Sequence, residues 1–65
     1  MKISVNSEPR EITGATLADA LDELGFPGAA LATALNGAFV PRIDRGATLL
    51  KEGDRLEVLA PMQGG

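Results

Sequence analysis

The group in this sequence best suited to chemistry lies at its C-terminal end, in the segment Pro61-Met62-Gln63-Gly64-Gly65. Two consecutive glycines make this end thin enough to enter a channel that any Cβ would block. Five extended residues reach roughly 17 Å at about 3.4 Å each, enough to place Gly65 in another protein's active site. We therefore expect Gly65 to carry the reacting carboxylate, with Gly64 and Gln63 threading behind it. The alternative is a frayed end or a product of processing.

An ionised carboxylate resists attack at its carbon, and the Gly65 carboxylate is ionised at neutral pH. Conversion to an acyl-adenylate would supply a good leaving group, and a sulfur donor would then displace AMP to leave a C-terminal thiocarboxylate. ATP and Mg²⁺ would belong to the activating enzyme. We expect this chain to bind no cofactor itself and to serve as a co-substrate.

The rest of the sequence offers little catalytic chemistry. Cysteine and histidine are both absent, which removes thiolate nucleophiles, imidazole bases and the usual zinc ligands. Asp22 and Glu23 are neighbours that would not face each other on a helix. Glu52 and Asp54 lack a calcium-loop pattern, and neither a P-loop nor a dinucleotide fingerprint is present. The sequence predicts a protein that is not an enzyme and holds no metal.

Composition narrows the class of partner. A chain of 65 residues can form one small domain. The net charge is −3 and the six basic residues are scattered, so we expect no nucleic-acid partner. Without a long apolar run or a signal peptide, we expect no membrane partner and a cytoplasmic location. The net negative charge is explained either by a partner with a basic docking surface or by the ordinary need for solubility.

Strands and one helix are predicted to position the C-terminal segment. Residues 2–6 alternate as a strand with Ile3 and Val5 on one face, residues 7–9 supply a turn, and residues 10–13 offer a second strand. Thr16, followed three residues later by Asp19, resembles a capping box, which predicts a helix from Leu17. Gly25 should end that helix. Its apolar stripe is Leu17, Ala20, Leu21 and Leu24.

The second half of the chain is predicted to be mostly strand. Residues 29–35 and 38–40 flank Asn36-Gly37, which predicts a type I′ hairpin turn. Pro41 ends the return strand. Residues 43–50 contain a turn at 44–46 and then a brief strand or an irregular segment. Residues 52–54 form another turn, and residues 55–60 form a last strand with Leu56 and Val58 inward.

These elements predict an α+β fold, a sheet covered on one face by a single helix. Residues 1–60 would form the domain and residues 61–65 a flexible tail. Because one helix covers only one face, we expect an apolar patch for a partner on the other face. The alternative is a small secondary core. The candidate partner-surface residues are Phe39, Val40, Arg42, Leu59 and Met62.

Several short segments together resemble the ThiS family of thiamine-pathway sulfur carriers. They are Ala34-Leu35-Asn36-Gly37, Val40-Pro41-Arg42, the run from Glu52 to Val58, and Gln63-Gly64-Gly65. The resemblance implies a ubiquitin-like β-grasp fold, in which the first and last strands pair in parallel at the centre of the sheet. One departure is Arg45, where many relatives carry an aromatic residue. The resemblance thus implies that a partner contact there is lost or altered.

The resemblance also implies a set of partners. An E1-like adenylyltransferase would activate Gly65, a sulfurtransferase or cysteine desulfurase system would load sulfur, and thiazole synthase would take the sulfur into the thiazole ring of thiamine. Three alternatives stay open at this point: a small subunit of molybdopterin synthase, a ubiquitin-like modifier that forms isopeptide bonds, and a binding module with an inert tail.

Overall fold

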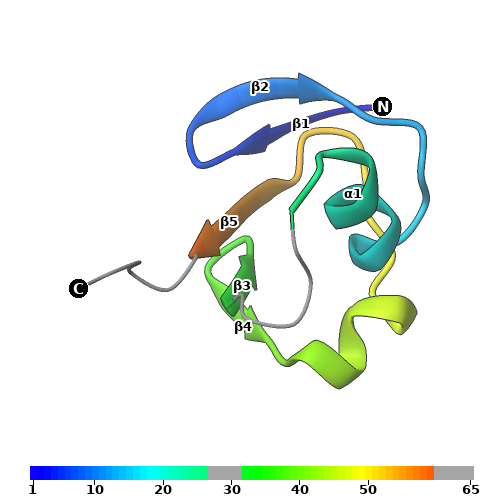
Figure 1. Ribbon diagram of the computed structural model, residues 1–65. Helices are drawn as coiled ribbons and strands as arrows, with labels where there is room; N and C mark the ends of the chain where they lie inside the picture. The colour runs from blue at the N-terminus through cyan, green and yellow to red at the C-terminus, as the bar shows by residue number, and fades with distance from the viewer. Residues whose placement is uncertain (27–31, 60–65) are drawn as a thin grey trace.

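The computed structural model describes residues 1–26 and 32–59, and residues 27–31 and 60–65 lie outside this description. The described elements form one five-stranded sheet in the order β2-β1-β5-β3-β4, with α1 against one face (Figure 1). Their bounds are β1 Lys2–Val5, β2 Glu8–Glu11, α1 Leu17–Glu23, β3 Ala32–Leu35, β4 Ala38–Val40, the 3₁₀ helix η2 Arg42–Ala47, and β5 Arg55–Leu59.

The sheet is mixed, as the β-grasp resemblance implies. β1 and β5 run parallel, with Ser4 opposite Arg55 and Val5 opposite Leu56. The other three strand pairs are antiparallel. The first and last strands therefore lie side by side at the middle of the sheet, and β5 is flanked by strands on both edges.

The core lies between α1 and one face of the sheet. In β5 the odd-even alternation buries Leu56 and Val58 and leaves the residues between and beside them exposed, because successive strand side chains point to opposite faces. The predicted helical stripe is also confirmed. Ile3 and Val5 join it from β1. The buried cluster comprises Ile3, Val5, Ile12, Leu17, Ala20, Leu21, Val40, Leu50, Leu56 and Val58, with Leu24 packed against it.

Both ends of α1 are capped by residues that the sequence singled out. The Thr16 hydroxyl oxygen accepts a hydrogen bond from the Asp19 backbone N–H at 3.1 Å. At the other end, the Gly25 N–H donates to the Asp22 carbonyl and the Phe26 N–H donates to the Leu21 carbonyl. This pair of bonds is the Schellman motif, and it satisfies carbonyls that the helix leaves open.

The two hairpins differ in how well the sequence predicted them. Asn36 and Gly37 have φ of 51° and 87°, as a type I′ turn requires. The first turn was placed wrongly: it lies at Asn6 and Ser7, with φ of 50° and 72°, rather than at residues 7–9. Pro9 instead sits inside β2, which is an edge strand where its missing N–H costs no ladder bond.

Residues 43–50, which the sequence left open, hold all of η2 except its first residue, followed by an isolated bridge between Leu49 and Thr16. Arg45 of η2 is buried at 5% exposure. Its Nε donates to the Thr33 hydroxyl at 3.2 Å, and that hydroxyl donates to the Val40 carbonyl at 2.8 Å. The Arg45 side chain is therefore part of the protein interior and is hydrogen-bonded there.

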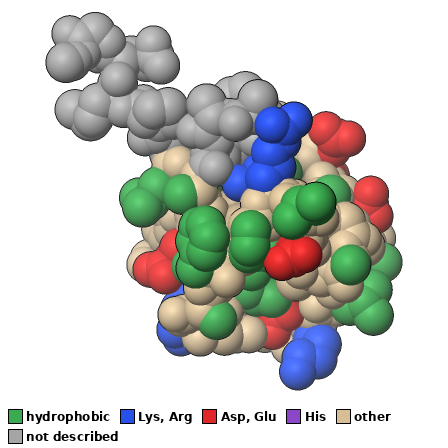
Figure 2. All heavy atoms as spheres, turned by 90° about the horizontal axis from the view of Figure 1, so that it is seen from below, with side chains coloured by type: hydrophobic (Ala, Val, Ile, Leu, Met, Phe, Trp, Pro, Cys, Tyr) green, Lys and Arg blue, Asp and Glu red, His purple; other side chains and the backbone are tan. Residues whose placement is uncertain are grey.

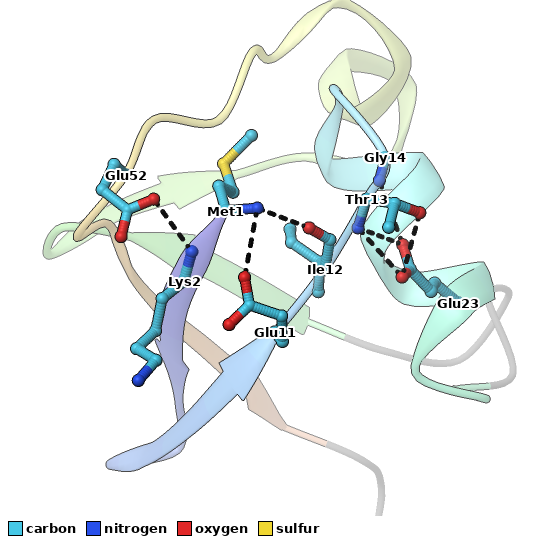
Figure 3. A network of polar contacts seen from close by, with 8 residues as sticks. All are labelled: Met1, Lys2, Glu11, Ile12, Thr13, Gly14, Glu23 and Glu52. Carbon is cyan, nitrogen blue, oxygen red and sulfur yellow. Dashed lines mark hydrogen bonds and ion pairs between the residues drawn. The ribbon is translucent and has the colours of Figure 1, made fainter.

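A polar network joins the chain's first residues and the loop before α1 to their neighbours (Figure 3). The Met1 ammonium donates to the Ile12 carbonyl at 2.7 Å and lies 3.5 Å from the Glu11 carboxylate. The Glu23 carboxylate of α1 accepts bonds from the N–H groups of Thr13 and Gly14. The end of the helix is thus tied to the loop that leads into it.

Candidate functional site

The root of the C-terminal segment is β5, which ends at Leu59. On one edge it pairs with β3 as far as Leu59 opposite Ala32. The residues predicted to react or to thread, Gly65, Gly64 and Gln63, lie outside the described residues, as does Met62. The structure therefore describes the base from which this segment leaves.

The sheet face opposite α1 brings Phe39 and Leu59 together. Their exposed fractions are 69% and 71%. Phe39 of β4 pairs with Ala34 of β3, and Ala34 in turn pairs with Glu57 of β5, so these side chains form a row across three strands. The exposure predicted for Phe39 and Leu59 is confirmed, and their contact with a partner stays a prediction.

A hollow of about 230 Å³ lies on this open face. Alanine side chains at 32 and 34 leave space in β3, because each ends at Cβ while the flanking strands carry larger residues. Phe39 and Leu59 contribute apolar walls, and Glu57 contributes a carboxylate. We name this cavity the open-face hollow. It is lined by Asn6, Ala32, Thr33, Ala34, Phe39, Glu57 and Leu59.

Val40 does not belong to this surface. It is 9% exposed and sits in the core cluster. Val40 pairs with Thr33, which faces the core, whereas its neighbour Phe39 pairs with Ala34 on the open face. Two consecutive strand residues cannot share a face, so the prediction that both are exposed was wrong for Val40.

Arg42 lies at a different place. It is exposed, and it lines a second hollow between α1 and η2 rather than the open-face hollow. The structure thus brings together two of the five predicted surface residues, Phe39 and Leu59. A partner contact at Arg42 remains a prediction. The second hollow is lined by Ala18, Leu21, Asp22, Phe26, Arg42, Arg45 and Gly46.

The molecule seen from below presents hydrophobic side chains with acidic ones among them and basic ones toward the margins (Figure 2). The large hydrophobic residues that the described part of the chain exposes are Phe39, Ile43, Leu49 and Leu59. Two of these four line the open-face hollow. The lining of the open-face hollow is mostly apolar, with Asn6, Thr33 and the carboxylate of Glu57 as its polar members.

One buried acid lies at the start of β5. Asp54 accepts bonds from the Asn36 side chain at 3.0 Å and from the Lys51 N–H at 2.7 Å. Burial alone raises the pKa of Asp54, but these bonds and the Lys51 charge outweigh it, so the pKa lies below its usual value. Asp54 therefore stays ionised and joins the β3–β4 turn to β5, a structural role.

Within residues 1–26 and 32–59 there is no group of three or more side chains able to hold a metal ion. Within the same ranges, no helix combines the length and apolar character needed to cross a membrane.

Comparison with known proteins decides the family. The model of the ThiS family matches residues 3–65.

The chain belongs to the ThiS family.

Its relatives span the same length. The sulfur carrier protein ThiS of Thermus thermophilus is 38% identical over 61 residues, covering 94% of this chain and 95% of that protein. The crystal structure of the thiamine biosynthesis protein ThiS from Geobacter metallireducens superposes with a TM-score of 0.82 at 33% identity, with both chains fully covered. The ubiquitin-like fold is therefore the ThiS fold, as the resemblance implied.

A different arrangement occurs in another relative. A thiazole synthase of Magnetococcus marinus is 41% identical over 66 residues, which cover this whole chain but only 20% of that protein. A ThiS-like segment thus occurs within a much longer chain that is named for thiazole synthesis.

Sequence reasoning missed several residues that line the open-face hollow. Asn6 was counted as strand, and Ala32, Ala34 and Glu57 were not considered as surface residues. The alternation of β3 was visible in the sequence, and it could have shown that the alanines share a face with Phe39 across the hairpin.

Proposed function

We propose that this chain is a sulfur carrier of thiamine biosynthesis, with Gly65 as the residue that is adenylated and converted to a thiocarboxylate. The observation that carries this proposal is the family match, which extends to residue 65 and so includes the glycine pair. The Thermus thermophilus relative, which carries the name sulfur carrier protein, supports it over nearly its whole length.

The chemistry proceeds in two steps. A Gly65 carboxylate oxygen attacks the α-phosphorus of ATP, the bond to the β-phosphate breaks, and pyrophosphate leaves. A sulfur nucleophile at the oxidation level of sulfide then attacks the acyl carbon, and AMP departs with the bonding pair and the former carboxylate oxygen. The net change is one oxygen replaced by one sulfur. ATP and Mg²⁺ serve the activating enzyme, and the chain itself is consumed and reloaded rather than acting as a catalyst.

Three partners follow from this chemistry. An E1-like adenylyltransferase carries out the first step, a sulfurtransferase or cysteine desulfurase system supplies sulfur, and thiazole synthase receives it. The last partner is supported by the Magnetococcus marinus thiazole synthase, which contains a segment similar to this entire chain. Fusion of two functions in one polypeptide places them at high effective concentration, which favours proteins that act on each other.

The open-face hollow is the docking surface in this proposal. It lies beside β5, the strand that leads into the C-terminal segment, and Leu59 belongs to both. A partner that binds Phe39 and Leu59 is therefore brought to the base of the segment whose end it must reach. Apolar side chains that fill such a hollow commonly supply most of the binding free energy.

Intact-mass measurement tests the proposal. Co-expression with an E1-like adenylyltransferase and a sulfur-loading system should shift the chain's mass by one oxygen-to-sulfur exchange, localised by fragmentation to Gly65. The control is a variant lacking Gly65, which should stay folded by circular dichroism, carry no sulfur and fail to support thiazole formation. An unmodified wild-type mass, under conditions that load the Thermus thermophilus carrier, would refute the proposal. Conjugates on lysines of other proteins would favour a modifier instead.

A further inference from the structure

The backbone of β1 stops supporting β5 before β5 ends. The parallel ladder between them includes the Ser4 N–H donating to the Asp54 carbonyl and the Asn6 N–H donating to the Leu56 carbonyl, at 3.0 and 2.9 Å. At Asn6 the chain turns away into the β1–β2 hairpin, with φ of 50°. Val58, two residues further along β5, therefore has no β1 backbone opposite it.

The side chain of Asn6 takes the place of the missing backbone. Its Oδ1 accepts a hydrogen bond from the Val58 N–H at 2.8 Å, and its Nδ2 donates to the Val58 carbonyl at 3.1 Å. A primary amide has the same donor and acceptor as a peptide group. Asn6 thus extends the ladder from Leu56 to Val58, the residue just before Leu59.

The opposite edge of β5 is held by β3, with Thr33 opposite Val58 and Ala32 opposite Leu59. Asn6 is therefore the side chain that completes support of the end of β5 on its β1 edge. Asn6 also lines the open-face hollow with Leu59. One residue, 52 positions away in sequence from Val58, connects the docking surface with the base of the C-terminal segment.

We propose that Asn6 is a positioning residue for the reaction of the C-terminal carboxylate, acting by pinning Val58 and so fixing the direction in which the chain leaves β5. This inference rests on the proposed function. We call the two hydrogen bonds between the Asn6 side chain and Val58 the clamp. Without the clamp, the end of β5 is free to detach from β1, and a partner must reorder it before Gly65 reaches the reacting centre. The free energy needed to order this end of β5 is then subtracted from the free energy of binding the partner.

The matched variants are Asn6→Gly and Ser7→Gly. Glycine accepts the positive φ of both turn positions, 50° and 72°. Asn6→Gly therefore removes the clamp and keeps the turn, while Ser7→Gly changes the same turn without touching Val58. Adenylation is followed as pyrophosphate release with an E1-like adenylyltransferase that activates the wild-type chain, ATP and Mg²⁺.

For Asn6→Gly we expect KM for the carrier to rise about tenfold with kcat changed less than about twofold, since the ordering cost falls on binding. Ser7→Gly should match the wild type. Hydrogen exchange supplies a readout independent of any partner: the Val58 amide should lose protection in Asn6→Gly while the amides of α1 keep theirs. A folded Asn6→Gly chain with wild-type KM would overturn the proposal, as would a Val58 amide that stays protected.

If Asn6→Gly does not fold, Asn6→Asp serves in its place. Aspartate tolerates positive φ and keeps an acceptor for the Val58 N–H, but when ionised it has no donor for the Val58 carbonyl. The same rise in KM is expected, because the bond to the Val58 carbonyl is lost, and a wild-type KM would overturn the proposal. Failure of the proposed function is distinct, because then the wild-type chain would not be adenylated.

Discussion

At the scale of single residues, Glu23 shows how one side chain can hold a loop. Its carboxylate accepts bonds from the Gly14 N–H at 3.1 Å and from the Thr13 N–H and hydroxyl at 2.9 and 3.2 Å (Figure 3). These donors, with the Gly14 N–H first, lower the pKa of Glu23 below its usual 4.5. An exposed acid is thereby committed to its charged form in the folded chain.

Replacing Glu23 by Gln is expected to destabilise the fold in a pH-dependent manner. Because the folded-state pKa is lowered, the stabilisation by Glu23 is complete above the unfolded-state pKa and is lost as pH falls through the folded-state value. Glu23→Gln should therefore unfold at lower urea concentration than the wild type at pH 7. The difference should shrink as pH falls below about 4.5. Urea titrations from pH 7 to pH 2.5 measure it.

Glu8→Gln is the matched control, since Glu8 is exposed and lies 3.9 Å from Arg10 in a surface ion pair. Such pairs contribute little, so this variant should follow the wild type at every pH. A Glu23→Gln curve that runs parallel to the wild-type curve down to pH 2.5 would contradict the assignment.

At the scale of elements, η2 is joined to β3 by a hydrogen bond to the buried hydroxyl of Thr33. Thr33 is 1% exposed, accepts from Arg45 Nε and donates to the Val40 carbonyl. A buried charged side chain is tolerated only when its donors are satisfied. The position of η2 therefore depends on Thr33 as well as on apolar packing.

Thr33→Val keeps the shape and removes the hydroxyl, so the Nε of Arg45 loses this acceptor inside the protein. We expect a loss of about 1–3 kcal/mol in the free energy of unfolding, measured by chemical denaturation. Thr48→Val is the comparison, because the Thr48 hydroxyl bonds the Asp44 carbonyl at an exposed position. It should change stability by less than about 0.5 kcal/mol. Equal losses in the two variants would show that burial of Thr33 is irrelevant.

Local patterns predicted the elements that depend on neighbouring residues. The Thr16 cap, the helical stripe and the Asn36-Gly37 turn are all confirmed, since each is specified within a few positions. The first hairpin is present, but its turn was misplaced because Pro9 was taken as a turn residue. Its acceptance in β2 depends on that strand being at the edge, which no local pattern encodes.

The candidate site was predicted in part for a similar reason. Exposure of Phe39 and Leu59 follows from one helix covering one face. The role of Asn6 depends on a contact with Val58 across 52 positions of sequence. Likewise, the burial of Arg45 depends on Thr33 in another element. Such contacts can be predicted only once the order of the strands in the sheet is known.

At the scale of the whole molecule, the two faces of the sheet have separate tasks: one carries the core and the other carries the hollow. Ala34 lies on the open face, between Phe39 and Glu57 across neighbouring strands. A larger side chain there would occupy the hollow without entering the core. Substitutions on the open face can therefore change the hollow and leave the core intact.

Ala34→Leu is expected to weaken binding to the adenylyltransferase and to thiazole synthase about tenfold or more, because the added side chain fills the space that a partner residue would take. The free energy of unfolding should change by less than about 1 kcal/mol. Calorimetric titration and chemical denaturation measure the two effects. Arg10→Leu, on the far edge strand β2, should leave binding intact. Unimpaired binding by Ala34→Leu would exclude the hollow as the docking surface.

The neighbouring positions of β1 and β5 at the middle of the sheet also have a kinetic consequence. The ladder between β1 and β5 can form only after β5 has left the ribosome. Until then, the edge of β1 that pairs with β5 stays unpaired in the nascent chain. Closing so long a loop slows folding relative to a helical bundle of the same size. Polypeptides cut short before β5 would therefore remain unfolded and open to proteolysis, so that only chains carrying β5 would accumulate.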